Sequence, residues 1–197
     1  MTVRLEVPAQ RHERAFLRAV EASRRLHRGL VSPPRTPKQF RAYLARLREA
    51  AFLGHLVCLS SGDLVGVINI NEIVRGRFRS AYLGYYAFAP HSGQGHMKRG
   101  LELVLSRAFR KHKLHRLEAN IQPGNLPSRA LVKRLGFRLE GYSPRYLRIS
   151  GRWRDHERWA LTIEDWRDRQ RVTRQSSHAG RDAGVGAARP KRRTRRR

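Results

Sequence analysis

The stretch YLGYYAFAPHSGQGHMKR, residues 82–99, decides the fold of this chain. Residues 82–89 are almost all apolar and stop at Pro90, which predicts a strand. A loop that contains Gly93 and Gly95 follows. Beyond this loop, apolar residues recur at the three- and four-residue spacing of an amphipathic helix with one buried face. The segment therefore predicts a strand, a glycine loop and the first turn of a long helix.

A strand that ends in a glycine loop at the start of a helix is suited to binding an anion. The first turn of a helix leaves about four backbone N–H groups without partners, and the helix dipole adds partial positive charge there. Glycine has no Cβ, so the backbone can approach a phosphate closely. An ordinary strand-to-helix turn can contain the same two glycines, so the rest of the chain has to distinguish the two interpretations.

The rest of the sequence predicts alternating helices and strands. The helix that begins at residue 36 has a Thr N-cap followed by Pro37, a strong start signal. Helices are expected at 10–27, 36–51, after 96 and at 127–135, and strands at 2–7, 55–59, 64–74, 82–89, 114–121, 137–149 and 153–162. The order is one strand, two helices, three antiparallel strands, a helix, a strand, a helix and a hairpin. This order predicts an α/β (α+β) fold.

Length and cysteine content narrow the class of protein. The chain has 197 residues, which suits one α/β domain with a tail. It shows no apolar run of the ~18–20 residues that a membrane span needs, and no secretion signal. Cys58 is the single cysteine, which excludes a disulfide framework and a zinc site and favours a buried structural thiol. We therefore expect a cytoplasmic protein without a metal and without membrane contact.

The charge is strongly positive. Lys and Arg number 43 against 15 Asp and Glu, a net charge of +28. Residues 167–197 carry 12 basic and 2 acidic residues and almost no large apolar ones, which predicts a disordered basic tail after a folded domain at 1–166. The folded domain alone carries 31 basic and 13 acidic residues. Such a field favours nucleic acid or ribonucleoprotein partners and disfavours polycationic substrates, although a general arginine bias in composition would give the same count.

Four segments together resemble the GNAT acetyltransferase superfamily, and within it the group that acetylates ribosomal-protein N-termini on alanine. They are GVININEIVRGRF (66–78), LGYYAFAPHSGQGHM (83–97), NLPSRALVKRLGFRLEG (125–141) and RYLRISGRWRDHERWAL (145–161). The resemblance implies a mixed, mostly antiparallel sheet of about seven strands with about four helices. In such folds the fourth strand splays away from the fifth, and acetyl-CoA sits in the wedge between them.

The resemblance also implies which residues contact the cofactor. The pyrophosphate takes the backbone amides of the glycine loop, although Ser92 and Met97 depart from the usual loop pattern. The implied cofactor-binding residues are Phe88, Ala89, Gly93, Gln94, Gly95, His96, Met97, Lys98, Asn125, Ser128 and Arg129. Among these, the N–H groups of Phe88 and Ala89 are expected to polarise the thioester carbonyl. Arg99 and Lys133 are further candidates for phosphate contacts, although each basic side chain alone is more often a solvated surface cation.

The catalytic residues are the least defined part of the prediction. Many relatives place an acidic Tyr seven residues after the Asn, where this chain has Val132. The group resembled implies Ser128 instead as donor to the leaving thiolate, with Asn125 at the pantetheine. Both residues are also favoured helix caps, which is the structural alternative. Glu72 is expected either to orient a water or bind the acceptor ammonium, or to be a plain surface glutamate.

Several other residues have two interpretations each. Asp155 and His156 match the group's pattern and either shape the acceptor tunnel or form a structural pair. Tyr85 and Tyr86 are expected in the core or in the tunnel wall.

Three functions fit these observations. The first is acetyl-CoA-dependent acetylation of a protein N-terminal α-amine, with a ribosomal protein as acceptor and ribosomal RNA contacted through the basic surface and tail. An α-amine has a pKa near ~8, against ~10.4 for lysine, so it needs little help from a base. The second function is acetylation of a small-molecule amine. The third is a catalytically degenerate RNA- or ribosome-binding module, which would bind RNA but no acetyl-CoA.

Overall fold

The computed structural model describes residues 2–182. The boundary between two compact units falls after Ile163, close to the expected domain end at residue 166. The first unit contains one seven-stranded sheet, and the described residues of the second, 164–182, lie in a helix. Each unit is described by itself.

The seven strands form one mixed sheet in the order β1-β2-β3-β4-β5-β7-β6. Their bounds are β1 Val3–Glu6, β2 Leu53–Leu59, β3 Leu64–Val74, β4 Ser80–Ala87, β5 Arg116–Ile121, β6 Arg138–Ile149 and β7 Arg152–Thr162. Every neighbouring pair is antiparallel except β4 with β5, which is parallel. The predicted number of strands, their order along the chain and the mixed α/β class are confirmed.

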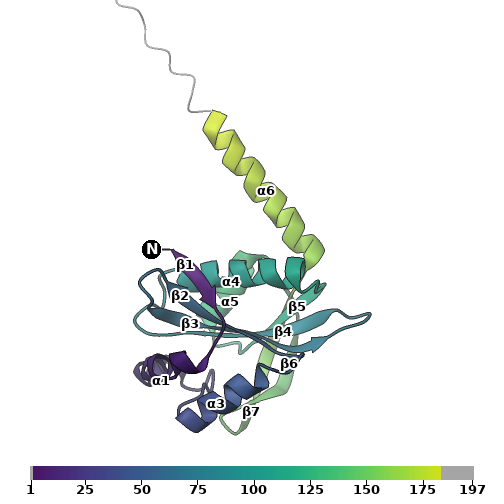
Figure 1. Cartoon of the computed structure of the whole chain (residues 1–197). Helices are drawn as coiled ribbons and strands as arrows, with labels where there is room; N and C mark the ends of the chain where they lie inside the picture. Colours follow the sequence, from purple (N-terminus) through teal and green to yellow (C-terminus); the bar gives the residue numbers. More distant parts are fainter. Residues whose placement is uncertain (1, 183–197) are drawn as a thin grey trace, which may run out of the picture. The chain divides into compact units, whose positions relative to one another are not determined.

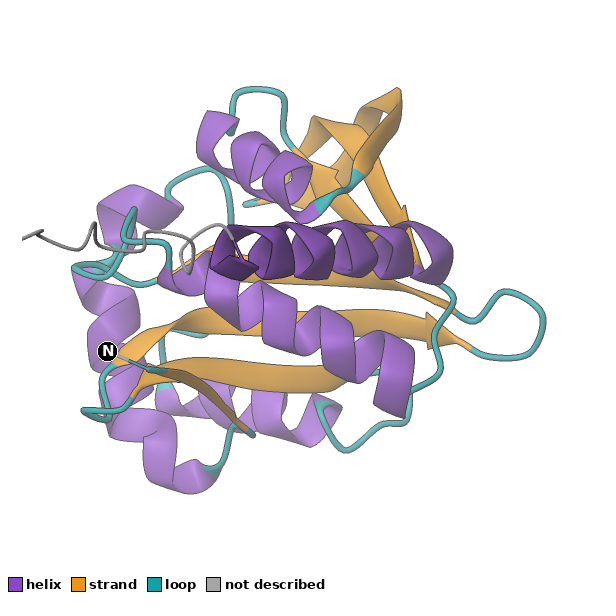
Figure 2. Ribbon diagram, turned by 90° about the horizontal axis from the view of Figure 1, so that it is seen from above, coloured by secondary structure: helices purple, strands orange, loops and turns teal. Residues whose placement is uncertain are grey.

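The helices of the first unit cover both faces of this sheet. They are η1 Gln10–His12, α1 Glu13–Ala22, α2 Arg24–His27, α3 Pro37–Arg46, α4 His96–Ser106, η2 Arg107–Lys111 and α5 Leu126–Leu135. Figure 1 shows α1 and α3 on one face and α4 and α5 on the other. In the view of Figure 2, helices lie both in front of and behind the strands. β2 and most of β3 are therefore buried on both sides.

The predicted single helix at 10–27 is interrupted at Ser23. The Ser23 hydroxyl donates to the carbonyl of Ala19 at 2.6 Å, and its oxygen accepts the backbone N–H of Ala89 at 2.9 Å. A serine that bonds back to the preceding turn competes with the helical ladder and bends the helix. The helix therefore breaks where Ser23 contacts the chain just beyond β4. A local sequence pattern does not reveal such a contact.

The second unit differs from its prediction. Residues 167–182 lie in α6, Ile163–Asp182, where the sequence predicts disorder. The described segment has no proline and is rich in Arg and Gln, which favour a helix. The two acidic residues Glu164 and Asp165 in its first turn suit the positive end of the helix dipole. The rest of the predicted tail, 183–197, lies outside the described residues.

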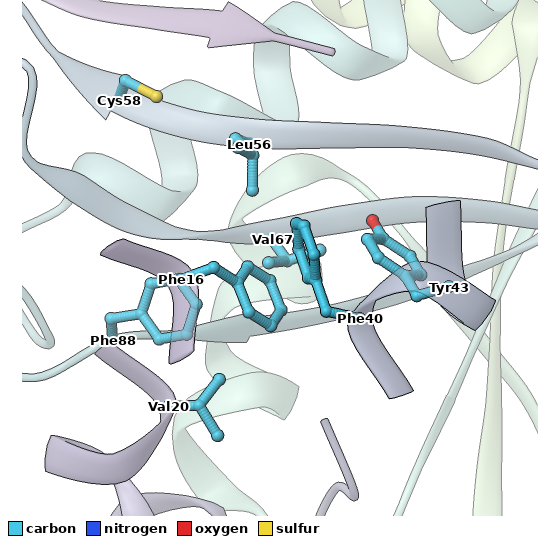
Figure 3. Packing of buried hydrophobic residues seen from close by; sticks show 8 residues of the cluster. All are labelled: Phe16, Val20, Phe40, Tyr43, Leu56, Cys58, Val67 and Phe88. Atoms are coloured by element: carbon cyan, nitrogen blue, oxygen red, sulfur yellow. The ribbon is translucent and has the colours of Figure 1, made fainter. Parts of the chain in front are cut away.

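An aromatic cluster fixes α1 and α3 against the sheet. The Phe16 ring lies 4.7 Å from that of Phe40 and 5.7 Å, edge to face, from that of Phe88. Figure 3 shows these rings gathered beside Leu56 and Val67 of β2 and β3. Cys58 is buried in the same cluster, and burial raises the pKa of its thiol to about 11, as a structural cysteine requires. Phe88 thus belongs to the core, immediately beyond β4.

No helix within residues 2–182 has the length and apolar character to cross a membrane.

The feature that makes a site is the short pairing between β4 and β5. Their register covers only Ser80 with Arg116, Ala81 with Leu117, and Tyr82 with Glu118. The two strands then diverge, although β4 continues to pair with β3 as far as Ala87. The predicted wedge is confirmed, and it opens from residue 83 onward.

His55 in β2 couples the stability of this sheet to pH. Burial, and then the nearby Arg107 guanidinium, lowers the pKa of His55 from 6.5 to about 4. Between these values the unfolded chain binds more protons than the folded chain, so the free energy of unfolding falls as pH falls from 6.5 towards 4. We expect a loss of about 3 kcal/mol from this group, measured by chemical denaturation at pH 7 and pH 4.

The substitution His55→Gln should flatten this pH dependence, because glutamine does not titrate. Val57→Ala gives the control, because it alters the same buried strand without a titratable group and should keep the wild-type slope. Equal slopes in all three proteins would show that His55 does not carry the effect.

Candidate active site

Two cavities meet inside the β4/β5 wedge. The first has a volume of about 450 Å³ and runs from α2 past the glycine loop to α5. The second has a volume of about 660 Å³ and lies among β3, β4, β5 and the β6/β7 hairpin. The residues that line both are Leu30, Val31, Tyr85, Asn125 and Ser128. The wedge therefore has two chambers with a common wall at Tyr85 and Ser128.

The glycine loop forms the far end of the first cavity. Gly93 and Gly95 both have φ of +80°, a conformation that strains any other residue. Gly95 is the N-cap of α4 and has no side chain to cap the helix. The N–H groups of the first turn thus face the loop at the positive end of the helix dipole. A backbone of this geometry can bind an anion, so the anion site stays a prediction.

Basic side chains near this loop divide into two groups. Lys98 lines the first cavity, and its Nζ donates to Glu102 at 2.8 Å. Arg134 of α5 also lines the cavity, although no sequence signal singled it out. The Arg129 guanidinium instead donates to the carboxylate of Glu157 at 2.9 Å and lines neither cavity. Arg129 thus forms an ion pair between α5 and β7, and its cofactor contact stays a prediction.

The predicted carbonyl-polarising groups are corrected. The N–H of Phe88 donates to the carbonyl of Val65 at 2.6 Å, and the N–H of Ala89 donates to the hydroxyl of Ser23 at 2.9 Å. Both groups are paired within the fold, and neither residue lines the two cavities. The partners come from β3 and from the end of α1, so residues 88–89 are tied into the core.

The backbone of β4 offers another donor one residue earlier. Because Phe88 bonds across to Val65, the alternation of an antiparallel ladder turns Ala87 and Tyr85 away from β3. The carbonyl of Ala87 confirms this direction, since it accepts a hydrogen bond from His27 Nε2 at 2.8 Å. The N–H groups of Ala87 and Tyr85 therefore share the edge of β4 that faces the wedge.

The common wall of the two chambers holds a pair of hydroxyl groups. Tyr85 Oη and Ser128 Oγ lie 2.5 Å apart. Burial raises the pKa of Tyr85 to about 12, so its hydroxyl stays protonated at neutral pH. Asn125 Oδ1 accepts the N–H of Ser128 at 3.3 Å, so Asn125 caps α5 in addition to lining both chambers. Sequence reasoning identified Ser128 but did not identify Tyr85 as its partner.

Two other predicted loop residues lie outside both cavity walls. Gln94 Nε2 donates to the carbonyl of Pro90 at 2.9 Å and so ties the loop to itself. The ring of His96 lies 6.4 Å from that of His91, which lines the first cavity in its place. The predicted residues that the first cavity does bring together are Gly93, Gly95, Met97, Lys98, Asn125 and Ser128. Residues 2–182 contain no group of three His, Cys, Asp or Glu side chains placed to hold a metal ion.

The second cavity contains polar side chains from three strands. Glu72 reaches its wall because a β-bulge after Asn71 puts Glu72 at φ of +51°. His156 is 3% exposed, and its Nδ1 bonds to the carbonyl of Arg154 at 2.9 Å, so Nδ1 carries the hydrogen and Nε2 the lone pair. Burial lowers the pKa of His156 and keeps the ring neutral.

Asp155 has a structural role in the same hairpin. Its carboxylate accepts the hydroxyl of Tyr142 and the backbone N–H of Arg145, the latter at 2.7 Å. These contacts lie where the β6/β7 register shifts between Ser143 and Leu147. Asp155 thus holds the irregular hairpin, whereas His156 lines the cavity.

Comparison with known proteins decides the family. The model of the acetyltransferase (GNAT) domain matches residues 3–138. The chain belongs to the GNAT acetyltransferase family. It is therefore an acetyl-CoA-dependent N-acetyltransferase, and the first cavity fits acetyl-CoA because it combines an apolar wall with unpaired backbone donors at a helix start.

Individual relatives agree with this family. The chain is 38% identical over 135 residues to the ribosomal protein uS5 alanine N-acetyltransferase of Escherichia coli, which covers 66% of this chain and 70% of that one. It is 33% identical over 129 residues to the probable N-acetyltransferase YjcK of Bacillus subtilis, with 65% and 71% covered. The structure of Mycobacterium smegmatis RimJ in complex with CoA-disulfide superimposes with a TM-score of 0.76, at 31% identity and 83% of each chain.

Substitution of Gly95 tests the anion site. Gly95→Val should weaken CoA binding at least tenfold in isothermal titration calorimetry, because a β-branched residue is strained at φ of +80° and the loop must change shape. Gly124→Ala is the matched control, since Gly124 has no positive φ and no neighbour within 4 Å of an added Cβ. Unchanged CoA affinity in Gly95→Val would contradict the phosphate-loop assignment.

Proposed function

We propose that this chain transfers an acetyl group from acetyl-CoA to the α-amine of a protein N-terminus, and that the acceptor is a ribosomal protein. The observation that carries the proposal is the meeting of the two cavities at Tyr85 and Ser128. A donor bound in one chamber and an acceptor bound in the other would meet there, which suits direct transfer in a ternary complex. The name of the Escherichia coli relative, an alanine N-acetyltransferase of ribosomal protein uS5, supports the acceptor class.

Acetyl-CoA supplies the activated acetyl thioester. The loop with Gly93 and Gly95 would bind its pyrophosphate through backbone N–H groups, with Lys98 and Arg134 adding positive charge. The N–H of Ala87, at the edge of β4, is suited to donate to an acyl carbonyl oxygen bound in the wedge. The Ala87 N–H lies on a strand that pairs with β3, so it needs little reorganisation when it donates.

Ser128 and Tyr85 would stabilise the leaving thiolate by a hydrogen bond. Ser128 Oγ can donate to a sulfur atom in the wedge while it accepts a hydrogen bond from Tyr85 Oη. Tyr85 keeps its proton because burial raises its pKa, so it fixes the direction in which the serine hydroxyl points. The tyrosine that many relatives carry at the position of Val132 is thus replaced in function by a tyrosine on β4.

The acceptor chamber is suited to an amine that is already partly neutral. His156 presents a neutral ring, and Glu72 lies exposed at the wall, where it would contact the incoming ammonium. The pKa of an α-amine is ~8, so a modest fraction is neutral at pH 7, whereas lysine at ~10.4 is almost wholly charged. A weak proton acceptor such as His156 or water is enough to deprotonate an α-amine, but it is not enough for a lysine side chain.

An acceptor panel tests the proposal. The panel contains peptides with the N-terminal sequences of ribosomal proteins, the same peptides with a blocked N-terminus and an internal lysine, and small amines. We expect acetyl-CoA consumption with the open N-termini alone, and a rate that rises with pH up to about 8 as the amine loses its proton. Activity on a small amine together with silence on every peptide would replace the protein acceptor with a small-molecule one.

Variants of the hydroxyl pair test the mechanism. Ser128→Ala should lower kcat roughly 100-fold with little change in the KM for acetyl-CoA, because the donor to the leaving group is removed. Tyr85→Phe should lower kcat roughly 10-fold, and the double variant should be no slower than Ser128→Ala, since the two groups act in series. Ser61→Ala removes a serine hydroxyl that bonds Asp63 in a remote turn, and it should keep full activity. Additive losses in the double variant would contradict the series arrangement.

A further inference from the structure

A basic surface with one exposed aromatic ring lies at the end of the β3/β4 hairpin. It consists of Arg75, Arg77, Phe78 and Arg79 in the hairpin loop together with Arg107, Lys111 and Lys113 around η2, and we call it the basic loop patch. All seven side chains belong to exposed residues. No Asp or Glu occurs in the sequence between Glu72 and Glu102, or between Glu102 and Glu118.

The two segments of the patch are fixed to each other. The Arg75 guanidinium donates to the carbonyl of His112 at 2.8 Å, and that of Arg79 donates to the carbonyl of Lys113 at 2.9 Å. The carbonyl of Arg79 also accepts the backbone N–H of His115 at 2.6 Å. The hairpin loop therefore does not move independently of the end of η2, and its charges form one surface.

The charges of the patch are not neutralised by the protein. Within residues 2–182, none of its six cations forms an ion pair with a carboxylate. The positive potential of the patch acts on His112. Burial, and then the cations Lys111, Arg75 and Arg107, lower the pKa of this histidine. Elsewhere in the first unit, cations such as Lys98, Arg116 and Arg129 do pair with carboxylates. The patch therefore gathers, on one surface, cations from two stretches of sequence that contain no Asp or Glu.

Phe78 adds an exposed aromatic ring to the charges of the patch. It is 74% exposed and is flanked by Arg77 and Arg79. A single exposed apolar residue is common on protein surfaces, but an aromatic ring between arginines is the arrangement that stacks a nucleic-acid base while cations hold the phosphates. An anionic membrane would need a larger apolar face, and an acidic peptide would make no use of the ring.

We propose that the basic loop patch binds RNA, with its cations on the phosphates and Phe78 stacked on an unpaired base. This proposal rests on the proposed function, since a ribosomal-protein acceptor is presented next to ribosomal RNA. Position supports it, because Arg75 in the patch follows Glu72 at the acceptor cavity by three positions, which span at most about 10 Å of chain. RNA held on the patch would therefore present a neighbouring protein N-terminus close to the acceptor cavity.

The first test measures binding of the full-length chain to a fluorescent RNA hairpin with an unpaired loop, by anisotropy at several salt concentrations. Arg77→Glu and Lys111→Glu should each weaken binding at least fivefold. Each should also reduce the slope of log affinity against log salt by roughly 0.7–0.9 for every phosphate that the variant no longer neutralises. Arg18→Glu and Lys38→Glu are matched controls, because they make the same charge change at exposed sites on α1 and α3. The controls should stay within twofold of wild type.

The second test isolates the ring. Phe78→Leu keeps an apolar side chain but removes the stacking surface, so it should weaken binding of the hairpin roughly 5- to 100-fold and leave binding of a blunt duplex unchanged. Equal weakening on hairpin and duplex, or none on either, would overturn the stacking part of the proposal. All substitutions fall on exposed side chains, and unchanged melting temperatures would confirm that the variants fold.

Other outcomes overturn the proposal as a whole. If Arg77→Glu and Lys111→Glu bind RNA no more weakly than the two control variants, the patch is not the RNA site. If they bind RNA normally but lose affinity for phosphatidylserine vesicles or polyglutamate, the partner is a membrane or an acidic protein. Acetylation of a free N-terminal peptide should be unaffected in every patch variant. Absence of that activity in the wild-type chain would refute the proposed acceptor and leave the RNA result standing.

Discussion

Parallel pairing of β4 with β5 stops after Tyr82 and Glu118, and the site depends on this separation. Beyond that point the edge of β4 no longer bonds to a neighbouring strand, so its backbone groups must find other partners or face a ligand. The strand itself stays in place because β3 pairs with it up to Ala87 on the other side. A rigid strand with one open edge can thus lie between two cavities without local disorder.

The far end of β4 is held by the first helical segment. His27 bonds the carbonyl of Ala87, and Ser23 bonds the N–H of Ala89. Phe88 between them is fully buried against Phe16. These contacts fix the place where the chain enters the glycine loop, so the loop and the wedge are oriented together. The interruption of the helix at Ser23 is therefore part of what builds the cofactor side of the site.

Most elements could be predicted from the sequence because their signals are local. The strand at 64–74 matches β3 to the residue, and Gly136 ends α5 with φ of +93° at its C-cap. The family resemblance located the wedge and Ser128, which periodicity alone could not do. The partners of Phe88, Ala89 and Arg129 could not be predicted, because Val65, Ser23 and Glu157 lie 23 to 66 residues away in the sequence. Contacts of that kind leave no local pattern.

The helix at 163–182 could not be predicted for a different reason. Composition indicated disorder because the segment lacks the apolar residues that build a core. Helix propensity and acidic residues at the first turn act independently of a core, and they favour a polar helix in the described part of this segment. Low hydrophobicity therefore bears on whether a segment can form a packed core, but not on whether it forms a helix.

The positive charge of the first unit has a chemical consequence for the proposed reaction. A positive potential disfavours the protonated form of an amine and lowers its pKa. An α-amine, with an ordinary pKa near ~8, needs only a small shift to become the neutral nucleophile at pH 7, whereas a lysine, with a pKa near ~10.4, needs a shift of more than about 3 units. The charge that would hold RNA on the surface would also help to deprotonate an N-terminal acceptor. An N-terminal acceptor would then need no carboxylate base.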